Sequence, residues 1–501
     1  MPTESVTPFL AMAVALVGAA LIVVTRRSPN LREACSLGVS VIQFLLVLTM
    51  IPPILDGETL HYTVLAFLPQ VAIEFRVDAL ALLFGITASF LWILTTIYSI
   101  GYMRHLREHD QTRYFAFFAL VLAATMGIAF SANLITLYVF YELLTFMTYP
   151  LVTHAGSDDA SAAGKKYLLY QLGSSFMFLL PAIIVTYTMA GTFDFRPNGV
   201  FPVGANVTLL VVVFCLFLAG TAKAAIMPLH SWLPSAMVAP TPVSALLHAV
   251  AVVNAGVFLI IRVILDVFGT DLLRQLHLDV LTAVVVSVTI LVASFHALRL
   301  DSLKAVLAYS TIGQLSYMIL GVVLLSPTGM VGGILHLVNH AESKITLFFC
   351  VGSIYLVTRK TKISELSGIG RRMPWTMAAF SIGALSIVGI PPTAGFITKW
   401  FLVTGSLEAD KLAIVFVLVL STLLSAAYYF RILRVAFFGS PPEGEAPDEP
   451  SQAAETSVPD ERPQIREASP LIMAPILVCA GLSVILGIFP NFFIDLVRLA
   501  L

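Results

Sequence analysis

The chain has 501 residues, of which 58% are hydrophobic and 11% are charged, and its formal net charge is −1. A water-soluble domain carries about 25% charged residues, so this composition indicates a protein that crosses a membrane many times. The near-zero net charge gives no basis for nucleic-acid binding. The cysteines stand singly in apolar segments without the spacing of a metal or iron–sulfur site, so we expect no metal, no redox centre and no other cofactor.

Apolar runs of bilayer-spanning length follow one another through the chain and predict an all-α polytopic membrane protein of about fourteen helices. The runs lie at 9–25, 32–51, 78–101, 115–131, 132–153, 166–190, 206–227, 240–266, 277–298, 303–325, 328–357, 375–404, 411–436 and 469–499. Residues 437–468 are rich in Pro, Glu and Ser and predict a flexible cytoplasmic linker before a C-terminal helix in 469–501.

Basic residues predict the orientation of the helices. The first positive charge, Arg26, follows the first apolar run, which favours an uncleaved first helix with its N-terminus outside. Alternate loops then hold most of the arginines and lysines, as the positive-inside rule requires of cytoplasmic loops. An even helix count places both termini outside, in a bacterial or archaeal plasma membrane.

Two apolar runs are interrupted by proline. One contains Lys223 and continues to Pro228 and Pro234, and the other contains 389–395 (Gly-Ile-Pro-Pro-Thr-Ala-Gly) shortly before Lys399. Proline removes a backbone donor, so we expect two broken helices with free carbonyls. Broken helices in corresponding halves, each with a lysine nearby, point to internal repeats around a transport path. A gating hinge without a transport role is the alternative.

Five charged residues within these apolar runs stand out as candidates for function: Glu142, Lys223, Lys304, Lys344 and Lys399. A charge in hydrocarbon costs about 2.5–3.5 kcal/mol on insertion scales, so such residues normally face a protein interior or a wet cavity. The pattern predicts a buried polar path through the membrane. The other hypothesis is a structural scaffold whose buried charges are inert.

Glu142 shares one helical face with Tyr138, Thr145 and Tyr149. A carboxylate between hydroxyls suits a protonatable site, and Lys223 is the natural cation to pair with it. Moving the two charges apart would release the lysine's proton, which makes the pair a candidate electrostatic switch. A static salt bridge that locks two helices is the alternative.

His336, His340 and Lys344 follow at i, i+4 and i+8 on a single stripe, where histidines next to a lysine can relay protons through water. Two histidines one turn apart also suit a metal, but no third ligand is evident nearby, and histidines satisfied by neighbouring helices remain open. His248 pairs with Ser244 and would connect Lys223 to this stripe. Lys304 lies near a cytoplasmic end, where snorkelling to the interface is the alternative.

The remaining polar residues give no sign of enzyme chemistry. His154, His230 and Glu74 lie near the interfaces, where we expect solvated or structural roles. The chain has no Gly-rich phosphate loop, nucleophile elbow or dinucleotide fingerprint. Any enzyme activity would therefore depend on partner subunits.

Several of these stretches together resemble the proton-translocating antiporter-like family, which includes large subunits of Mrp-type cation/proton antiporters, of the membrane arm of respiratory complex I and of membrane-bound hydrogenases. The matching stretches are Tyr141-Glu142-Leu-Leu-Thr145, Lys223 through His248, Asp301-Ser-Leu-Lys304-Ala-Val-Leu-Ala-Tyr-Ser-Thr, Asn339-His340 through Lys344, and Gly389-Ile-Pro-Pro through Lys399.

The resemblance implies fourteen helices, with helices 1–3 in 1–114 and two inverted five-helix repeats in 115–266 and 267–436. It also implies a proton path through Glu142 and Lys223, a central relay that includes His248, His336, His340 and Lys344, and Lys399 on the exit side. A lysine at 399 resembles the D-type subunit of the Mrp group, or its hydrogenase relatives, more than the complex I subunit of similar length. Two departures stand out: Asn254 replaces a lysine found in many relatives, and Glu342 adds a carboxylate beside Lys344.

The leading hypothesis is therefore a proton-translocating member of a multi-subunit complex, the D-type subunit of an Mrp-type Na⁺/H⁺ antiporter, with other integral membrane subunits as partners and protons and Na⁺ as the ions. The alternative is the same pump module driven by a redox complex, either a hydrogenase or an NADH:quinone oxidoreductase.

Overall fold

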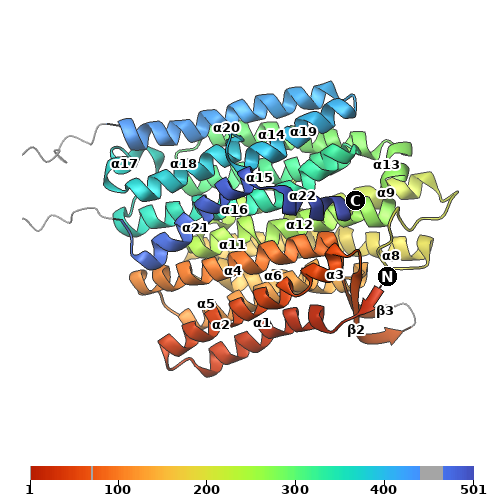
Figure 1. Ribbon diagram of the computed structural model, residues 1–501, viewed down its shortest axis with the longest axis horizontal. Coiled ribbons are helices and arrows are strands. Elements are labelled where there is room, and N and C mark those ends of the chain that lie inside the picture. The colour runs from red at the N-terminus through yellow and green to blue at the C-terminus, as the bar shows by residue number, and fades with distance from the viewer. Residues whose placement is uncertain (1, 69–70, 440–466) are drawn as a thin grey trace, which may run out of the picture.

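The computed structural model describes residues 2–68, 71–439 and 467–501, and it confirms an all-α polytopic architecture (Figure 1). Long helices run side by side along one direction, and the N- and C-termini lie at the same end of the bundle. We call this the terminal end and the other the loop end. Residues 440–466 of the expected linker lie outside the described residues.

The N-terminal part contains several long uninterrupted apolar helices. Its helices are α1 (Thr7–Val24), α2 (Pro29–Leu48), α3 (Ile51–Leu55), α4 (Ala79–Leu106), α5 (Gln111–Ala129) and α6 (Leu134–Val152). Two of these helices have N-capping side chains. Asp78 accepts a hydrogen bond from the Ala81 amide at the start of α4, and Asn133 accepts one from the Thr136 amide at the start of α6.

The middle of the chain is less regular. It contains α7 (Asp158–Ser174), η1 (Ser175–Leu179), α8 (Leu180–Ala190), α9 (Val207–Gly220), η2 (Ala222–Ala224), α10 (Trp232–Ser235), η3 (Ala236–Val238), α11 (Thr241–Ala249), α12 (Val252–Arg262), η4 (Val263–Phe268) and α13 (Thr270–Gln275).

The C-terminal part is built around α16, which is buried along most of its length and packs against α4, α11, α15, α18, α19 and α21. Its elements are α14 (Leu278–Arg299), α15 (Leu303–Val323), α16 (Pro327–Thr358), η5 (Ile363–Glu365), α17 (Ile369–Arg372), α18 (Pro374–Val388), α19 (Ala394–Glu408), α20 (Leu412–Phe438), α21 (Pro470–Ile488) and α22 (Asn491–Leu499).

In the described chain, twelve helical segments are long and apolar enough to span a membrane, and Val207–Gly220 and Pro374–Val388 are shorter apolar helices. The predicted count of fourteen membrane-spanning helices remains a prediction. Each of the two apolar runs with internal prolines is divided into shorter helices, which the count of twelve does not include. The predicted run at 469–499 also differs: α21 ends at Ile488 and the short α22 follows, since Pro490 between them cannot donate a helical hydrogen bond.

Both predicted breaks are present. Helix α9 ends at Gly220 and gives way to the single turn η2, which carries Lys223, and α18 ends at Val388 before α19 resumes at Ala394. A third break, at Val250–Ala251 between α11 and α12, was not predicted. There the side chain of Asn254 donates a hydrogen bond of 2.8 Å to the Ala249 carbonyl, which the break leaves without a helical partner.

A small sheet at the terminal end is the one departure from the all-helical prediction within the described residues. It has the order β1 (Pro2–Glu4), β2 (Thr59–Leu68), β3 (Val71–Val77), with β1 parallel and β3 antiparallel to β2. Leu60 pairs with Val77 and Thr63 with Glu74. The segment is rich in β-branched and aromatic residues, which favour a strand hairpin over a helix.

Candidate functional site

Most of the predicted path residues are buried in the bundle. Glu142, Lys223, His248, His336, His340, Lys344 and Lys399 are each no more than 9% exposed, and only Lys304 is partly exposed. They lie on α6, η2, α11, α15, α16 and α19. The three breaks place Lys223, His248 and Lys399 on, beside or one turn beyond irregular backbone, where free carbonyls are available.

Lys223 contacts α6, but it does not form the expected ion pair with Glu142. Its Nζ donates a 2.6 Å hydrogen bond to Thr145 Oγ1 and lies 3.4 Å from the centre of the Tyr141 ring. Thr145 is one turn beyond Glu142 on the same helical face, so the two side chains are alternative partners for one lysine. In the structure, the ammonium group of Lys223 is hydrogen-bonded to the hydroxyl of Thr145.

A close backbone approach fixes Lys223 against α12. A Cβ added to Gly256 would lie 2.3 Å from the Ala224 nitrogen and 2.6 Å from the Lys223 carbonyl carbon. Only glycine fits at this crossing. The turn is also held by the Trp232 indole, which donates a hydrogen bond of 2.9 Å to the Ala222 carbonyl.

The central histidines of α16 link that helix to three others. His340 Nε2 is 3.1 Å from the backbone oxygen of His248 on α11. His336 Nδ1 is 2.9 Å from Thr398 Oγ1 on α19, and its Nε2 is 2.9 Å from Gln314 Oε1 on α15. The predicted relay residues are therefore brought together, with ring centres of His336 and His340 6.3 Å apart.

Lys344 and Lys399 are both held by neutral oxygens. Lys344 Nζ donates to the Leu307 carbonyl at 3.2 Å and to the Tyr429 hydroxyl at 3.3 Å. Lys399 Nζ donates at 3.0 Å to the carbonyl of Val388, the last residue of α18, and at 3.0 Å to Thr422 Oγ1. The second broken helix thus supplies a free carbonyl to a buried lysine, as the sequence predicted.

Lys304 is partly exposed and lines a cavity at the loop end, so snorkelling stays the alternative for this residue. Its Nζ donates a 2.9 Å hydrogen bond to the Ala239 carbonyl, just before α11. Beside it lies a cavity of about 370 Å³ whose lining includes Ser302, Lys360 and Thr361 at the loop end. Lys304 therefore joins the loop end to the backbone next to the central histidines.

The carboxylate of Glu342 does not lie beside the ammonium group of Lys344. Residues two positions apart point to different sides of a helix, and Glu342 Oε1 accepts a 2.7 Å hydrogen bond from Ser343, which in turn bonds Ser386 on α18. Glu342 also lines an apolar cavity together with Leu482 of α21. Glu342 therefore lies on the opposite side of α16 from the lysine.

A buried ion-pair network at the terminal end was not predicted from the sequence. Arg262 donates to both carboxylate oxygens of Asp78 at 2.7 Å and to Asp266 at 2.8 Å. The i, i+4 spacing of Arg262 and Asp266 inside one apolar run was an available signal. Burial alone would raise the pKa of the Asp78 carboxyl, but the guanidinium of Arg262 outweighs burial and holds that pKa well below its usual range.

Two family models match the sequence. The NADH:quinone oxidoreductase/Mrp antiporter transmembrane model matches residues 131–425, and the model of the N-terminus of NADH-ubiquinone oxidoreductase (complex I) chain 5 matches residues 69–115. The first match contains every predicted path residue.

Relatives with different names are similar to the chain. NADH-quinone oxidoreductase subunit N of Desulforudis audaxviator is 32% identical over 438 residues, which cover 86% of this chain and 85% of that protein. The A/B subunit of a probable K⁺/H⁺ antiporter of Rhizobium meliloti is 30% identical over 81% of this chain and 40% of its own length. F420H2 dehydrogenase subunit L of Methanosarcina mazei is 33% identical over 73% of this chain and 58% of its own length.

Two solved structures share the fold. A chain of the Mrp complex from Dietzia sp. DQ12-45-1b has a TM-score of 0.86 at 24% identity and covers 99% of this chain and 96% of its own. A chain of an archaeal membrane-bound sulfane sulfur reductase, a respiratory membrane complex, has a TM-score of 0.85 at 24% identity and covers 99% and 97%.

Proposed function

Because the chain belongs to the NADH:quinone oxidoreductase/Mrp antiporter family of membrane proteins, we propose that it translocates protons as one member of a multi-subunit membrane complex. The more specific proposal is the D-type subunit of an Mrp-type monovalent cation/proton antiporter, with other integral membrane subunits as partners. It would lie in a bacterial or archaeal plasma membrane with both termini outside. The resemblance of Lys399 to the Mrp group and the sequence similarity to a subunit of a probable K⁺/H⁺ antiporter support this choice.

One observation carries the proposal: titratable side chains are buried on several elements between α6 and α19. Lys223, Lys344 and Lys399 are each held by a hydroxyl or carbonyl oxygen rather than by an ion pair within the described chain. A lysine without a fixed counter-ion in a low-dielectric interior exchanges its proton more readily than one locked to a carboxylate. Water entering between these groups would complete the relay.

The two alternative partners of Lys223 suggest how movement of its side chain is coupled to proton uptake and release. On Thr145 the lysine has a neutral acceptor, and on Glu142 it would have an anion that favours the protonated form. Moving between them would load and release a proton. One elementary charge crossing 100 mV is worth about 2.3 kcal/mol, which is the size of such a rearrangement.

The division into repeats is part of the same proposal. Residues 115–266 would form the first inverted repeat around Glu142 and Lys223, and residues 267–436 the second around Lys344 and Lys399. Each of these ranges contains one of the two proline-marked breaks, which is the arrangement expected of repeats that surround a midplane path.

Replacing Lys223 with alanine tests the path. In membrane vesicles that contain the assembled complex, we expect Lys223→Ala to abolish cation-dependent proton flux while the protein still assembles. Lys165→Ala, which removes an exposed lysine of α7, is the matched control and should leave the flux unchanged. Wild-type flux in Lys223→Ala would reject the assigned path.

The alternative is a proton-pumping subunit of a redox-driven complex, and it is favoured by the similarity to a quinone oxidoreductase subunit over 85% of that relative's length. Co-purification from native membranes distinguishes the two. Small antiporter subunits would support the Mrp assignment, and iron–sulfur or hydrogenase subunits would support the redox assignment.

A further inference from the structure

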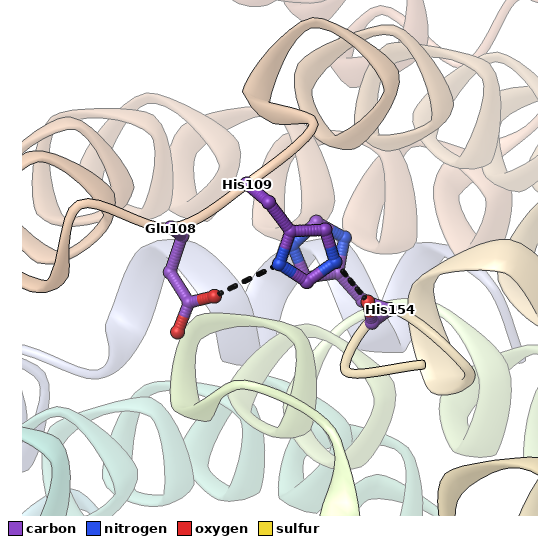
Figure 2. Close-up of side chains that lie close together, drawn as sticks. All are labelled: Glu108, His109 and His154. Atoms are coloured by element: carbon purple, nitrogen blue, oxygen red, sulfur yellow. Dashed lines mark hydrogen bonds and ion pairs between the residues drawn. The ribbon is translucent and has the colours of Figure 1, made fainter. Parts of the chain in front are cut away.

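Three potential metal ligands meet at the loop end, away from the path. Glu108 and His109 lie in the turn between α4 and α5, and His154 follows the end of α6 (Figure 2). The two imidazole rings stack with their centres 4.7 Å apart, and one ligand atom from each of the three residues lies within 4.8 Å of the others. From the sequence, His154 was expected to have only a solvated or structural role.

His109 is oriented as a metal ligand would be. Its Nε2 is 2.8 Å from the backbone oxygen of His154, so the proton sits on Nε2 and Nδ1 carries a lone pair. Metal-binding histidines commonly donate their second N–H to a carbonyl in this way. Nδ1 in turn lies 3.7 Å from Glu108 Oε2, close to the separation of about 3.3 Å between two ligands of one tetrahedral Zn²⁺.

His154 supplies the second, independent observation. The residue is 1% exposed, and neither ring nitrogen has a hydrogen-bond partner among the described residues. A buried polar group without a partner is uncommon in a native protein and calls for a physical reason. Glu108 and His109 are more exposed, so an ion has access to the buried ring from the loop end.

We propose that Glu108, His109 and His154 bind a divalent transition-metal ion such as Zn²⁺. Two imidazoles and one carboxylate suit zinc, with a water molecule as the fourth ligand. Mg²⁺ and Ca²⁺ prefer oxygen ligands and are disfavoured. The nearly parallel rings cannot both place a nitrogen lone pair on one ion, so binding requires one imidazole to rotate out of the stack. The bound ion would fasten the α4–α5 turn to the end of α6.

Metal titration of the full chain in lipid nanodiscs tests the site. After chelator treatment, isothermal titration with ZnCl2 should show one saturable site per chain, and MgCl2 should not compete. His109→Ala should weaken Zn²⁺ binding at least tenfold. His105→Ala is the control, because His105 is an exposed histidine one turn earlier on the same segment and should leave binding unchanged.

The competing arrangement is an ion pair between a protonated His109 and Glu108, which needs no metal. It predicts no saturable Zn²⁺ binding, or binding that His109→Ala and His105→Ala weaken equally, and either result overturns the proposal. His154→Gln should also weaken binding. Because His109 is exposed, His109→Ala keeps the test decisive even if the buried His154 substitution fails to fold.

Discussion

The buried charges of this protein are of two kinds, and the terminal end and the centre of the bundle show the contrast. At the terminal end, Arg262 is bound by Asp78 and Asp266 through three hydrogen bonds of 2.7–2.8 Å. In the centre, Lys223 and Lys399 have hydroxyls, a carbonyl and aromatic rings as their close partners within the described chain.

We propose that the ion-paired charges stabilise the fold and that the lysines with neutral partners carry protons. A guanidinium with two carboxylates has one favoured charge state and one favoured geometry, so it holds helices in place. A lysine whose hydrogen-bond partners are neutral oxygens can lose its proton without breaking an ion pair. We therefore expect substitutions at the two regions to affect different measurements.

A large loss of transport, second to that expected of Lys223→Ala, is expected at the second break. Lys399→Ala removes the titratable group that α19 contributes to the proposed path and should reduce proton flux about 100-fold, the usual worth of a positioned proton-transfer group. Thermal unfolding in detergent should change little, because a buried lysine with neutral partners contributes little net stability. A variant with normal flux and strongly lowered stability would instead make Lys399 a structural residue like Arg262.

The largest effect on stability is expected at the terminal end. Asp78→Asn leaves Arg262 with one carboxylate and should cost about 3 kcal/mol of unfolding free energy, while proton flux per folded chain stays near wild type. Denaturant unfolding in mixed micelles measures the first quantity and vesicle assays the second. If flux falls with an unchanged unfolding free energy, the assignment of this network to stability is wrong.

The pH dependence of the Asp78 interaction has a definite sign. The pKa of Asp78 is lower in the folded protein than its ordinary value, because Arg262 favours the carboxylate. Its stabilisation is therefore present at pH values above the unfolded-state pKa and is lost as the pH falls through the folded-state value. The Asp78→Asn variant should lack this acid-dependent loss, and an unchanged acid profile would show that another group controls it.

Smaller effects should follow removal of the neutral partners. Thr145→Val and Thr422→Val each delete one hydrogen bond to a path lysine, worth about 1 kcal/mol, and should change proton flux about fivefold. Thr404→Val is the control, because the Thr404 hydroxyl bonds only carbonyls of its own helix α19 within the described chain. Equal fluxes in all three variants would mean that the first two hydroxyls do not hold the lysines during transport.

No effect on flux is expected at Glu342. It is a buried carboxylate, but it lies on the side of α16 away from Lys344 and bonds Ser343. Glu342→Gln should therefore leave proton flux at the wild-type level. A large loss of flux would place Glu342 in the path and would undo the distinction drawn from its position.

Much of the fold could be predicted from sequence, because apolar runs and prolines report the length and interruption of membrane helices directly. The break at Val250–Ala251 could not, since neither residue is Pro or Gly and the interruption depends on Asn254 binding the freed carbonyl. The hairpin at 59–77 was not predicted, because its strands of 10 and 7 residues are too short to register as membrane-spanning runs.

The sequence indicated which polar residues of the candidate site are buried, but it did not indicate their contacts. Helical periodicity placed Glu142 and Thr145 on one face, yet periodicity cannot decide which of them Lys223 contacts, because that choice is made by side-chain rotamers. The hydrogen bond to Thr145 is visible only in three dimensions. The role of His154 was likewise hidden, because the sequence does not show that His109 stacks on it.

The absence of a side chain at Gly256 has a mechanical consequence. Because Gly256 has no side chain, the backbone of α12 contacts the backbone of the turn that carries Lys223 directly. Any sideways shift of α12 must therefore push that turn, and α12 begins at the break beside the central histidines. A movement near the central histidines would therefore displace the main chain at Lys223 directly, without intervening side-chain contacts.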